Sequence, residues 1–189
     1  YVVGYNPEQK PYSYDLGKAK QLIKDAGAGG TELKLVWLAG RFPRISELVE
    51  YIADAWGKIG LKVQPEARDA AGYRAGMKAK DPGQRGDLFL TNHGNDLGDS
   101  GRSIDGWLTC AAANSNFCDD KLEQLNRDAS RAAYGDRVNL LRDVWSYLYD
   151  QQPIVPLFRQ SVLHSLTARV KWVPRLDGAI RYDEMSLTE

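Results

Sequence analysis

The amino-acid sequence predicts an α/β fold in which helices flank a mixed, mostly parallel sheet. Two observations carry this prediction. Patterns of helical period alternate with short branched and aromatic runs between residues 15 and 91, and such alternation is typical of strand-helix-strand units. A chain of 189 residues can also form one substantial core, or one domain of a larger protein.

The first elements follow from turn residues and periodicity. Residues 1–14 hold prolines, a glycine and four tyrosines, so we expect an extended entry segment. Asp15 is predicted to cap a helix that Gly27 ends. The GAGG stretch then turns the chain into the strand ELKLVWL. The apolar face of the predicted helix consists of Leu16, Ala19, Leu22, Ile23 and Ala26.

The middle of the chain continues the alternation. A helix is expected from Pro43, which suits a first turn, to Gly60, which suits an end. We then expect a strand over Leu61–Arg68, a short helix near Tyr73–Lys80, a DPG turn and a strand over Asp87–Thr91. The apolar residues at helical spacing in the first of these helices are Ile45, Leu48, Val49, Ile52, Trp56 and Ile59.

Two helices and several extended segments are predicted in the second half. Apolar stripes place helices over Asp120–Ala133 and Arg137–Tyr149. The run QQPIVPLFR is expected to form a strand whose prolines indicate an edge or a bend. His164 lies in the alternating run SVLHSL and is interpreted as a structural histidine in a strand.

Charge and motifs exclude several classes of function. Lys+Arg and Asp+Glu both number 25, which disfavours nucleic-acid and anionic-membrane partners. The longest apolar runs are too short to span a bilayer. No GxSxG elbow or phosphate-binding glycine motif is present, so we expect no enzyme and no cofactor. A hydrolase that uses His93 as the base for a distant serine is the alternative from another class.

The stretch GDLFLTNHGNDLGDS places Asn92, His93, Asp96 and Asp99 just after a predicted strand. The spacing does not match a calcium loop, so no metal site is expected, although calcium and plain solvated carboxylates remain open. Ligands bind beyond the carboxyl ends of parallel strands. There, an ionised aspartate can bind an ammonium group. Arg41 follows an earlier strand in the same way, and one group of each charge suits a zwitterion.

The two cysteines, Cys110 and Cys118, lie in TCAAANSNFC. The spacing and the absence of a nearby histidine disfavour zinc. A disulfide that closes a small polar loop is the preferred interpretation, and it implies an oxidising compartment. Two free thiols are the alternative.

Five runs in order resemble the C-terminal lobe of the peptide-type (family 5) solute-binding proteins of ABC importers. They are PYSYDLGKAKQLIKDAG, ELKLVWL, IADAWGKIGLKV, GDLFLTNHGNDLGD and DRVNLLRDVWSYLYDQQPIVPLF, and the match covers nearly the whole chain. Dipeptide-binding members are the most similar in these motifs. The family loop usually has Trp where this chain has His93, and Pro where it has Ser100.

The resemblance implies a ligand-binding lobe of the periplasmic-binding-protein type, with a bridged cysteine loop. It implies that Asp96 binds a peptide amino group and that Arg41, or Arg44, binds the carboxylate. The expected partners are a peptide or similar solute, the importer's membrane subunits and a missing N-terminal lobe. Family members that bind nickel complexes, glutathione or sugars are alternatives, as is a peptide sensor or chaperone.

The same resemblance gives the expected organisation. Residues 1–14 would be an entry linker, 15–170 the ligand-binding lobe, and 171–189 a return segment toward the missing lobe. The opening YVVGYNPEQKPYSYD has no basic start or apolar core of a signal peptide. We therefore expect a sequence that begins inside a longer protein of the periplasm or cell surface.

Overall fold

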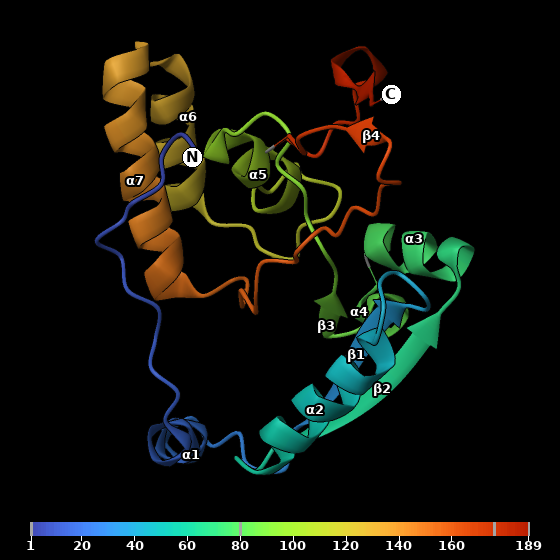
Figure 1. The fold of residues 1–189 in the computed structure, drawn as a ribbon. Helices are drawn as coiled ribbons and strands as arrows, with labels where there is room; N and C mark the ends of the chain where they lie inside the picture. The colour runs from blue at the N-terminus through green and yellow to red at the C-terminus, as the bar shows by residue number, and fades with distance from the viewer. Residues whose placement is uncertain (1, 80, 176, 189) are drawn as a thin grey trace. The chain divides into compact units, whose positions relative to one another are not determined.

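The computed structural model describes residues 2–79, 81–175 and 177–188 (Figure 1). The chain divides into two compact units. Unit 1 is formed by residues 1–9 and 94–189, and unit 2 by residues 10–93. Each unit has a hydrophobic core of its own. The predicted division at residues 14/15 and 170/171 stays a prediction about lobe organisation.

Unit 2 contains a three-stranded parallel sheet. Strands β1 (Glu32–Leu38), β2 (Lys62–Arg68) and β3 (Leu88–Leu90) pair in the order β2-β1-β3. The Asp87 carboxylate accepts a hydrogen bond from the Lys34 backbone N–H at 2.7 Å, which anchors the start of β3 beside β1. The predicted α/β fold with a mostly parallel sheet is confirmed, and β1 is the predicted strand residue for residue.

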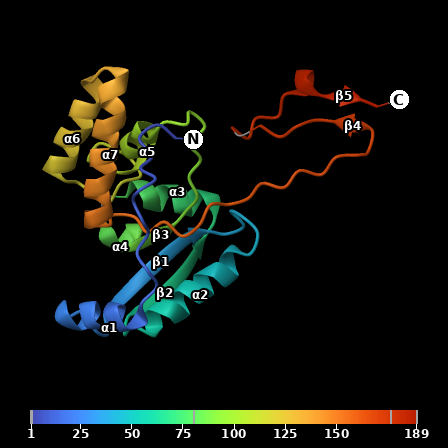
Figure 2. The same ribbon diagram turned by 60° about the vertical axis from the view of Figure 1, so that its left-hand side comes forward.

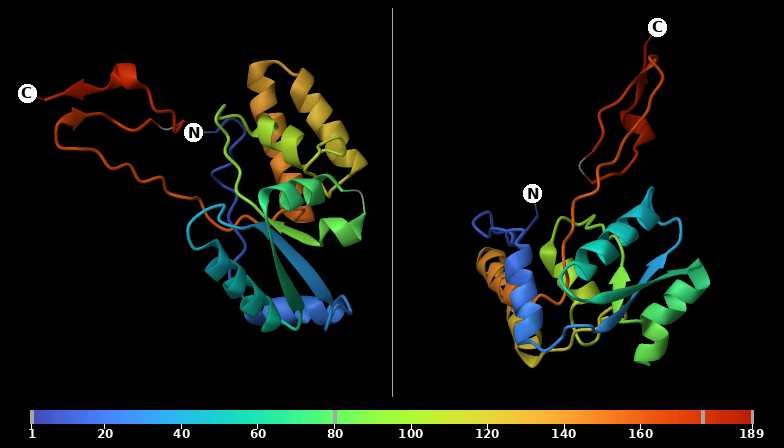
Figure 3. Two further views of the ribbon diagram at one scale, coloured as in Figure 1. Left: turned by 90° about the vertical axis from the view of Figure 1, so that its right-hand side faces the viewer. Right: turned by 90° about the horizontal axis from the view of Figure 1, so that it is seen from below.

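Helices cover both faces of this sheet (Figure 3). Successive side chains of β1 point to opposite faces, so the strand can pack on both sides. On one face, Leu35 and Trp37 pack against Ile45 and Val49 of α2. On the other face lies α3, whose Tyr73 donates a hydrogen bond to the Leu90 carbonyl. The helices of unit 2 are α1 (Leu16–Asp25), α2 (Ile45–Gly57), α3 (Ala70–Lys78) and α4 (Pro82–Arg85).

The helix starts agree with the prediction at α1 and differ from it at α2 and α3. Asp15 caps α1 as predicted, since its Oδ1 accepts from the Lys18 N–H at 2.9 Å. Helix α2 begins two residues after Pro43, because Arg44 adopts a left-handed backbone with φ of 61°. Asp69 caps α3 and starts it earlier than predicted, while its predicted end at Lys80 lies outside the described residues. The DPG turn is the start of α4.

Unit 1 is built on three helices, α5 (Ser100–Trp107), α6 (Asp120–Arg131) and α7 (Tyr134–Gln151). Helices α6 and α7 lie side by side and α5 packs on α6 (Figure 2). The predictions of α6 and α7 are confirmed, whereas α5 was expected to be loop. The buried core of this unit consists of Ile104, Leu108, Leu122, Ala129, Leu141, Val144 and Leu148.

Residues 152–175 and 177–188, which we call the tail, have little regular structure. The prediction of a strand over QQPIVPLFR is wrong, because these residues pair with no neighbouring strand in the described chain. His164 likewise lies outside any strand, and its ring meets Trp172 edge-on at 5.0 Å. The regular elements of the tail are β4 (Val170–Lys171), the 3-10 turn Tyr182–Glu184 and β5 (Ser186–Leu187), and β4 pairs antiparallel with β5.

Across the described ranges, no helix combines the length and apolar character needed to cross a bilayer.

Candidate ligand-binding site

Asp96 lies in a tight turn just before α5. The Gly98 N–H donates to the Asn95 carbonyl at 3.1 Å, and Gly98 has a left-handed backbone with φ of 61°. The Asp96 side chain is exposed at the tip of this turn. Among the residues that the structure describes, its carboxylate has no hydrogen-bond or ion-pair partner. It is therefore available to a cationic group.

Asp99 is engaged inside the unit. Its Oδ1 caps α5 by accepting from the Gly101 N–H at 2.8 Å. Arg137 of α7 donates to both carboxylate oxygens, at 2.5 and 2.9 Å. These hydrogen bonds hold the pKa of Asp99 below its ordinary value of 3.8, with Arg137 as the main cause. The role is structural, and a contact between Asp99 and ligand stays a prediction.

Arg41 and Asn92 come together at the carboxyl edge of the unit 2 sheet. Arg41 follows β1 and Asn92 follows β3, and the Arg41 Nε donates to the Asn92 Oδ1 at 2.6 Å. The expectation that these two loops open at one edge is confirmed. The two terminal nitrogens of Arg41 have no partner in the described part of the chain, so they can donate to a ligand. His93 is exposed beside Asn92 and makes contacts of its own.

Arg44, the alternative to Arg41, is paired with Glu47. Its guanidinium forms an ion pair with that carboxylate, which raises the pKa of Arg44 above its ordinary value. A shallow hollow of about 540 Å³ opens here, lined by residues 40 and 42–47. Because the Arg44 charge is balanced locally, Arg41 is the better candidate for a ligand carboxylate.

The predicted site residues therefore fall into two groups. Arg41, Asn92 and His93 belong to unit 2, and Asp96 and Asp99 belong to unit 1. The pairing of Asp96 with Arg41 on one ligand stays a prediction. No group of three or more His, Cys, Asp or Glu side chains suited to a metal ion occurs in residues 2–79, 81–175 and 177–188.

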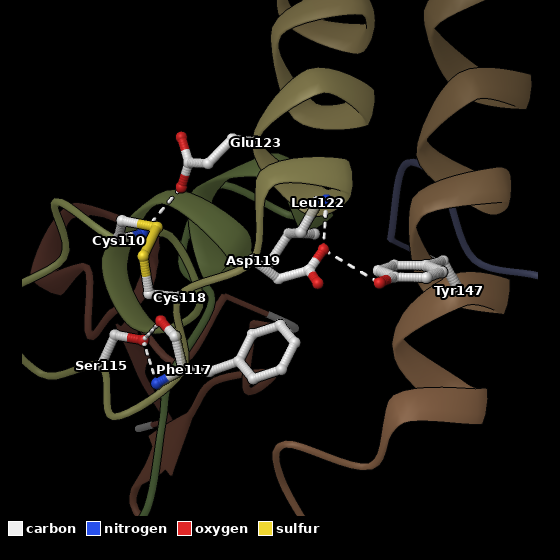
Figure 4. Close-up of a disulfide and its surroundings, with 8 residues drawn as sticks. All are labelled: Cys110, Ser115, Phe117, Cys118, Asp119, Leu122, Glu123 and Tyr147. Atoms are coloured by element: carbon white, nitrogen blue, oxygen red, sulfur yellow. Dashed lines mark hydrogen bonds between the residues drawn. A yellow bond between two sulfur atoms is a disulfide. The ribbon is translucent and has the colours of Figure 1, made fainter.

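The disulfide predicted between Cys110 and Cys118 is present (Figure 4). The Cys110 N–H donates to the Glu123 Oε1 at 2.7 Å. Directly after the bridge, the Asp119 carboxylate caps α6 and accepts from the Tyr147 hydroxyl at 2.9 Å. The bridge thus fixes the loop that leads from α5 into α6.

Sequence reasoning missed the residues that hold the Asp96 turn. Arg137 is 38 positions from Asp99 and was predicted only as part of a helix. Asn95 donates from its amide to the Asp99 carbonyl at 2.7 Å and to the Ser103 Oγ at 3.2 Å. An arginine at the start of a helix has no local feature that assigns its partner, so a structure was needed to find this pair.

A comparison with protein families supplies the identity of the chain. The family model described as bacterial extracellular solute-binding proteins, family 5 middle, matches residues 1–115. The chain belongs to this family. The resemblance seen in the sequence is therefore confirmed, and this family consists of solute-binding proteins rather than enzymes.

Curated relatives carry several ligand names. The chain is 27% identical over 184 residues to heme-binding protein A of Haemophilus influenzae, covering 90% of this chain and 32% of that protein. It is 26% identical over 178 residues to the dipeptide-binding protein of Escherichia coli, covering 89% and 32%. The chain thus spans about a third of the length of these relatives.

A solved structure supports the fold. The murein tripeptide binding protein MppA of Escherichia coli superposes with a TM-score of 0.79 at 17% identity, covering 100% of this chain and 38% of that one. At this identity the likeness shows the fold alone, which is the fold of family 5 binding proteins. The predicted fold class is confirmed.

Proposed function

We propose that this chain is one lobe of an extracytoplasmic solute-binding protein that captures a short peptide or a similar amine-bearing solute and delivers it to an ABC importer. The observation that carries the proposal is the state of Asp96. It is an exposed carboxylate at the tip of a hydrogen-bonded turn, without a partner in the described residues. Such a carboxylate can accept charge-assisted hydrogen bonds from an ammonium group.

The second contact in this proposal is Arg41. The Arg41 Nε donates to Asn92, and this hydrogen bond orients the plane of the guanidinium. The two terminal nitrogens stay available to donate to a ligand. A planar guanidinium suits the two oxygens of a carboxylate. A peptide carries an amine and a carboxylate at opposite ends, so Asp96 and Arg41 together favour a zwitterionic solute. His93 and Asn92, which lie beside Arg41 in the same unit, are further proposed ligand contacts.

The tail would contact the rest of the whole protein in this proposal. The tail carries more apolar side chains than suits a segment surrounded by solvent. These side chains are nevertheless exposed, with Leu163 at 93% and Val173 at 81% exposure. An extended run with unpaired backbone groups suits pairing with strands elsewhere. The importer's membrane subunits are the other proposed partner, and the compartment is the periplasm or cell surface.

The test uses calorimetry on the full-length protein with three probes. These are Ala-Ala, N-acetyl-Ala-Ala, which lacks the charged amine, and Ala-Ala amide, which lacks the carboxylate. Asp96→Ala is expected to weaken Ala-Ala binding by roughly 2–5 kcal/mol, the effect of truncating one member of a desolvated charge pair. The matched control is Asp150→Ala, an exposed carboxylate on α7, which should leave binding unchanged.

Acetylation of the probe should cost wild type as much as Asp96→Ala does, and should cost the variant nothing further. Equal binding of Ala-Ala by wild type and Asp96→Ala would remove Asp96 from the site. A heme, a metal complex, glutathione or a sugar found by native mass spectrometry on the purified protein would keep the family and discard peptide as the solute.

A further inference from the structure

The turn that presents Asp96 is closed by one side chain. Asn95 accepts from the Asp99 N–H through its Oδ1 at 3.3 Å and donates to the Asp99 carbonyl at 2.7 Å. The same amide reaches Ser103 of α5. Residues 95–99, which we call the Asp96 turn, are thereby tied to the first helical turn of α5.

The far end of the turn is fixed by Arg137. Its guanidinium binds Asp99 in a two-bond arrangement, and the two side chains are 23% and 26% exposed. A charge-assisted pair of parallel hydrogen bonds restricts direction as well as distance. Because Arg137 lies in the first turn of α7, the pair joins the Asp96 turn to the core helix of the unit.

A third attachment comes from residues 2–6, which we call the N-terminal strap. The Val3 N–H donates to the Gly98 carbonyl at 2.8 Å, and the Ser100 N–H donates to the Val3 carbonyl at 3.1 Å. Gly4 has φ of +84°, and a Cβ there would lie 2.7 Å from the Leu141 Cβ. The strap is therefore seated closely on α7, and Arg142 also donates to the Tyr5 carbonyl.

We infer that Arg137 is a positioning residue for ligand capture: it holds Asp99, and through Asp99 it fixes the direction in which the Asp96 carboxylate points. This inference rests on the proposed role of Asp96. A turn that is ordered before binding loses less conformational entropy when the ligand arrives. Arg137 itself donates inside the unit, so its effect on affinity passes through the turn.

The first arm of the test measures hydrogen exchange in the full-length protein without ligand. Arg137→Met should accelerate exchange of the amides of Gly98, Asp99 and Gly101 by about tenfold, since their acceptors lie on the released turn. Arg137→Lys keeps the charge but loses the two-bond geometry, so it should lie between wild type and Arg137→Met. The control is Arg131→Met, at the exposed end of α6.

The second arm is a double-mutant cycle on Ala-Ala binding. Arg137→Met should weaken binding about tenfold in the wild-type background and leave it unchanged in the Asp96→Ala background, because coupled residues are non-additive. Arg137→Lys should restore part of the affinity. A residue with only a general structural role would weaken binding equally in both backgrounds.

The two arms separate the inference from the proposed function. Unchanged exchange in Arg137→Met overturns the inference, and so does an equal loss of affinity in both backgrounds. Faster exchange together with the non-additive cycle supports it. If wild type ignores all three alanine probes, the proposed function fails, and the exchange arm alone supports or overturns the ordering of the turn by Arg137.

Discussion

Helix α7 and the start of the tail are adjacent in sequence and similarly rich in apolar residues, yet they have opposite environments. Leu141, Val144 and Leu148 of α7 are at most 3% exposed. Seven residues further on, Val155 is 61% exposed, and Leu163 is 93% exposed. The difference is the partner: α7 packs on α6 within the chain, whereas the tail residues have no such surface in the described chain. Apolar content therefore does not determine burial without a complementary element.

The largest effect that tests this comparison is expected at Leu141. Leu141→Ala should lower the free energy of unfolding by about 3 kcal/mol, the cost of lost burial plus a cavity in a packed core. Urea unfolding of the 189-residue chain followed by circular dichroism measures it. Leu163→Ala is the control of identical chemistry and should change the stability by less than about 0.5 kcal/mol. Equal losses at both positions would show that the tail is packed.

A somewhat smaller effect is expected from the disulfide. Replacing Cys110 and Cys118 by serine frees a loop with a sequence separation of 8, and should cost about 2–3 kcal/mol through the larger entropy of the unfolded chain. The same urea experiment with and without reductant measures it. The reductant should destabilise wild type and leave the double-serine variant unaffected, and a variant as stable as wild type would contradict the expectation.

The smallest of the three effects depends on pH. Asp99→Asn should cost about 2 kcal/mol at neutral pH, the scale of hydrogen bonds to a charged group. Because Arg137 lowers the folded-state pKa of Asp99, this stabilisation is present above the ordinary pKa of 3.8 and is lost as the pH falls through the lower folded value. Asp105 and Tyr134 also act on Arg137 and raise its pKa.

Unfolding midpoints of wild type and Asp99→Asn, measured from pH 7 down to about pH 2, should therefore converge at the acid end. A constant difference across this range would mean that ionised Asp99 contributes nothing beyond its shape.

Much of unit 2 could be predicted from sequence because its signals are local. Asp15 is a side-chain cap beside an apolar helical pattern, and β1 is an alternating run between turn residues. Helix α5 was not predicted because its sequence, SGRSIDGW, contains two glycines and has a low helix propensity. Its helix is stabilised by burial of Ile104 and by the Asp99 cap, which are tertiary and flanking features.

The candidate site was predictable only in part. The residue types and the strand ends that place Arg41 and Asn92 together could be inferred, since parallel strands end at a common edge. The pairing of Asp99 with Arg137 could not, because helical periodicity does not assign partners across 38 positions. The strand prediction for the tail failed for a different reason. The β-propensity of its residues predicts an extended backbone, but a strand also needs a neighbouring strand to pair with.

The N-terminal strap has a consequence for the order in which the chain folds during synthesis. Val3 leaves the ribosome before unit 2, whereas its partners Gly98 and Ser100 follow only after all of unit 2 has been made. The strap's contact with Leu141 comes later still. Domains generally fold as units while translation proceeds, so the sheet of unit 2 can close while the strap remains unpaired. Residues made before unit 2 thus take their place in unit 1 only after unit 2 has been made.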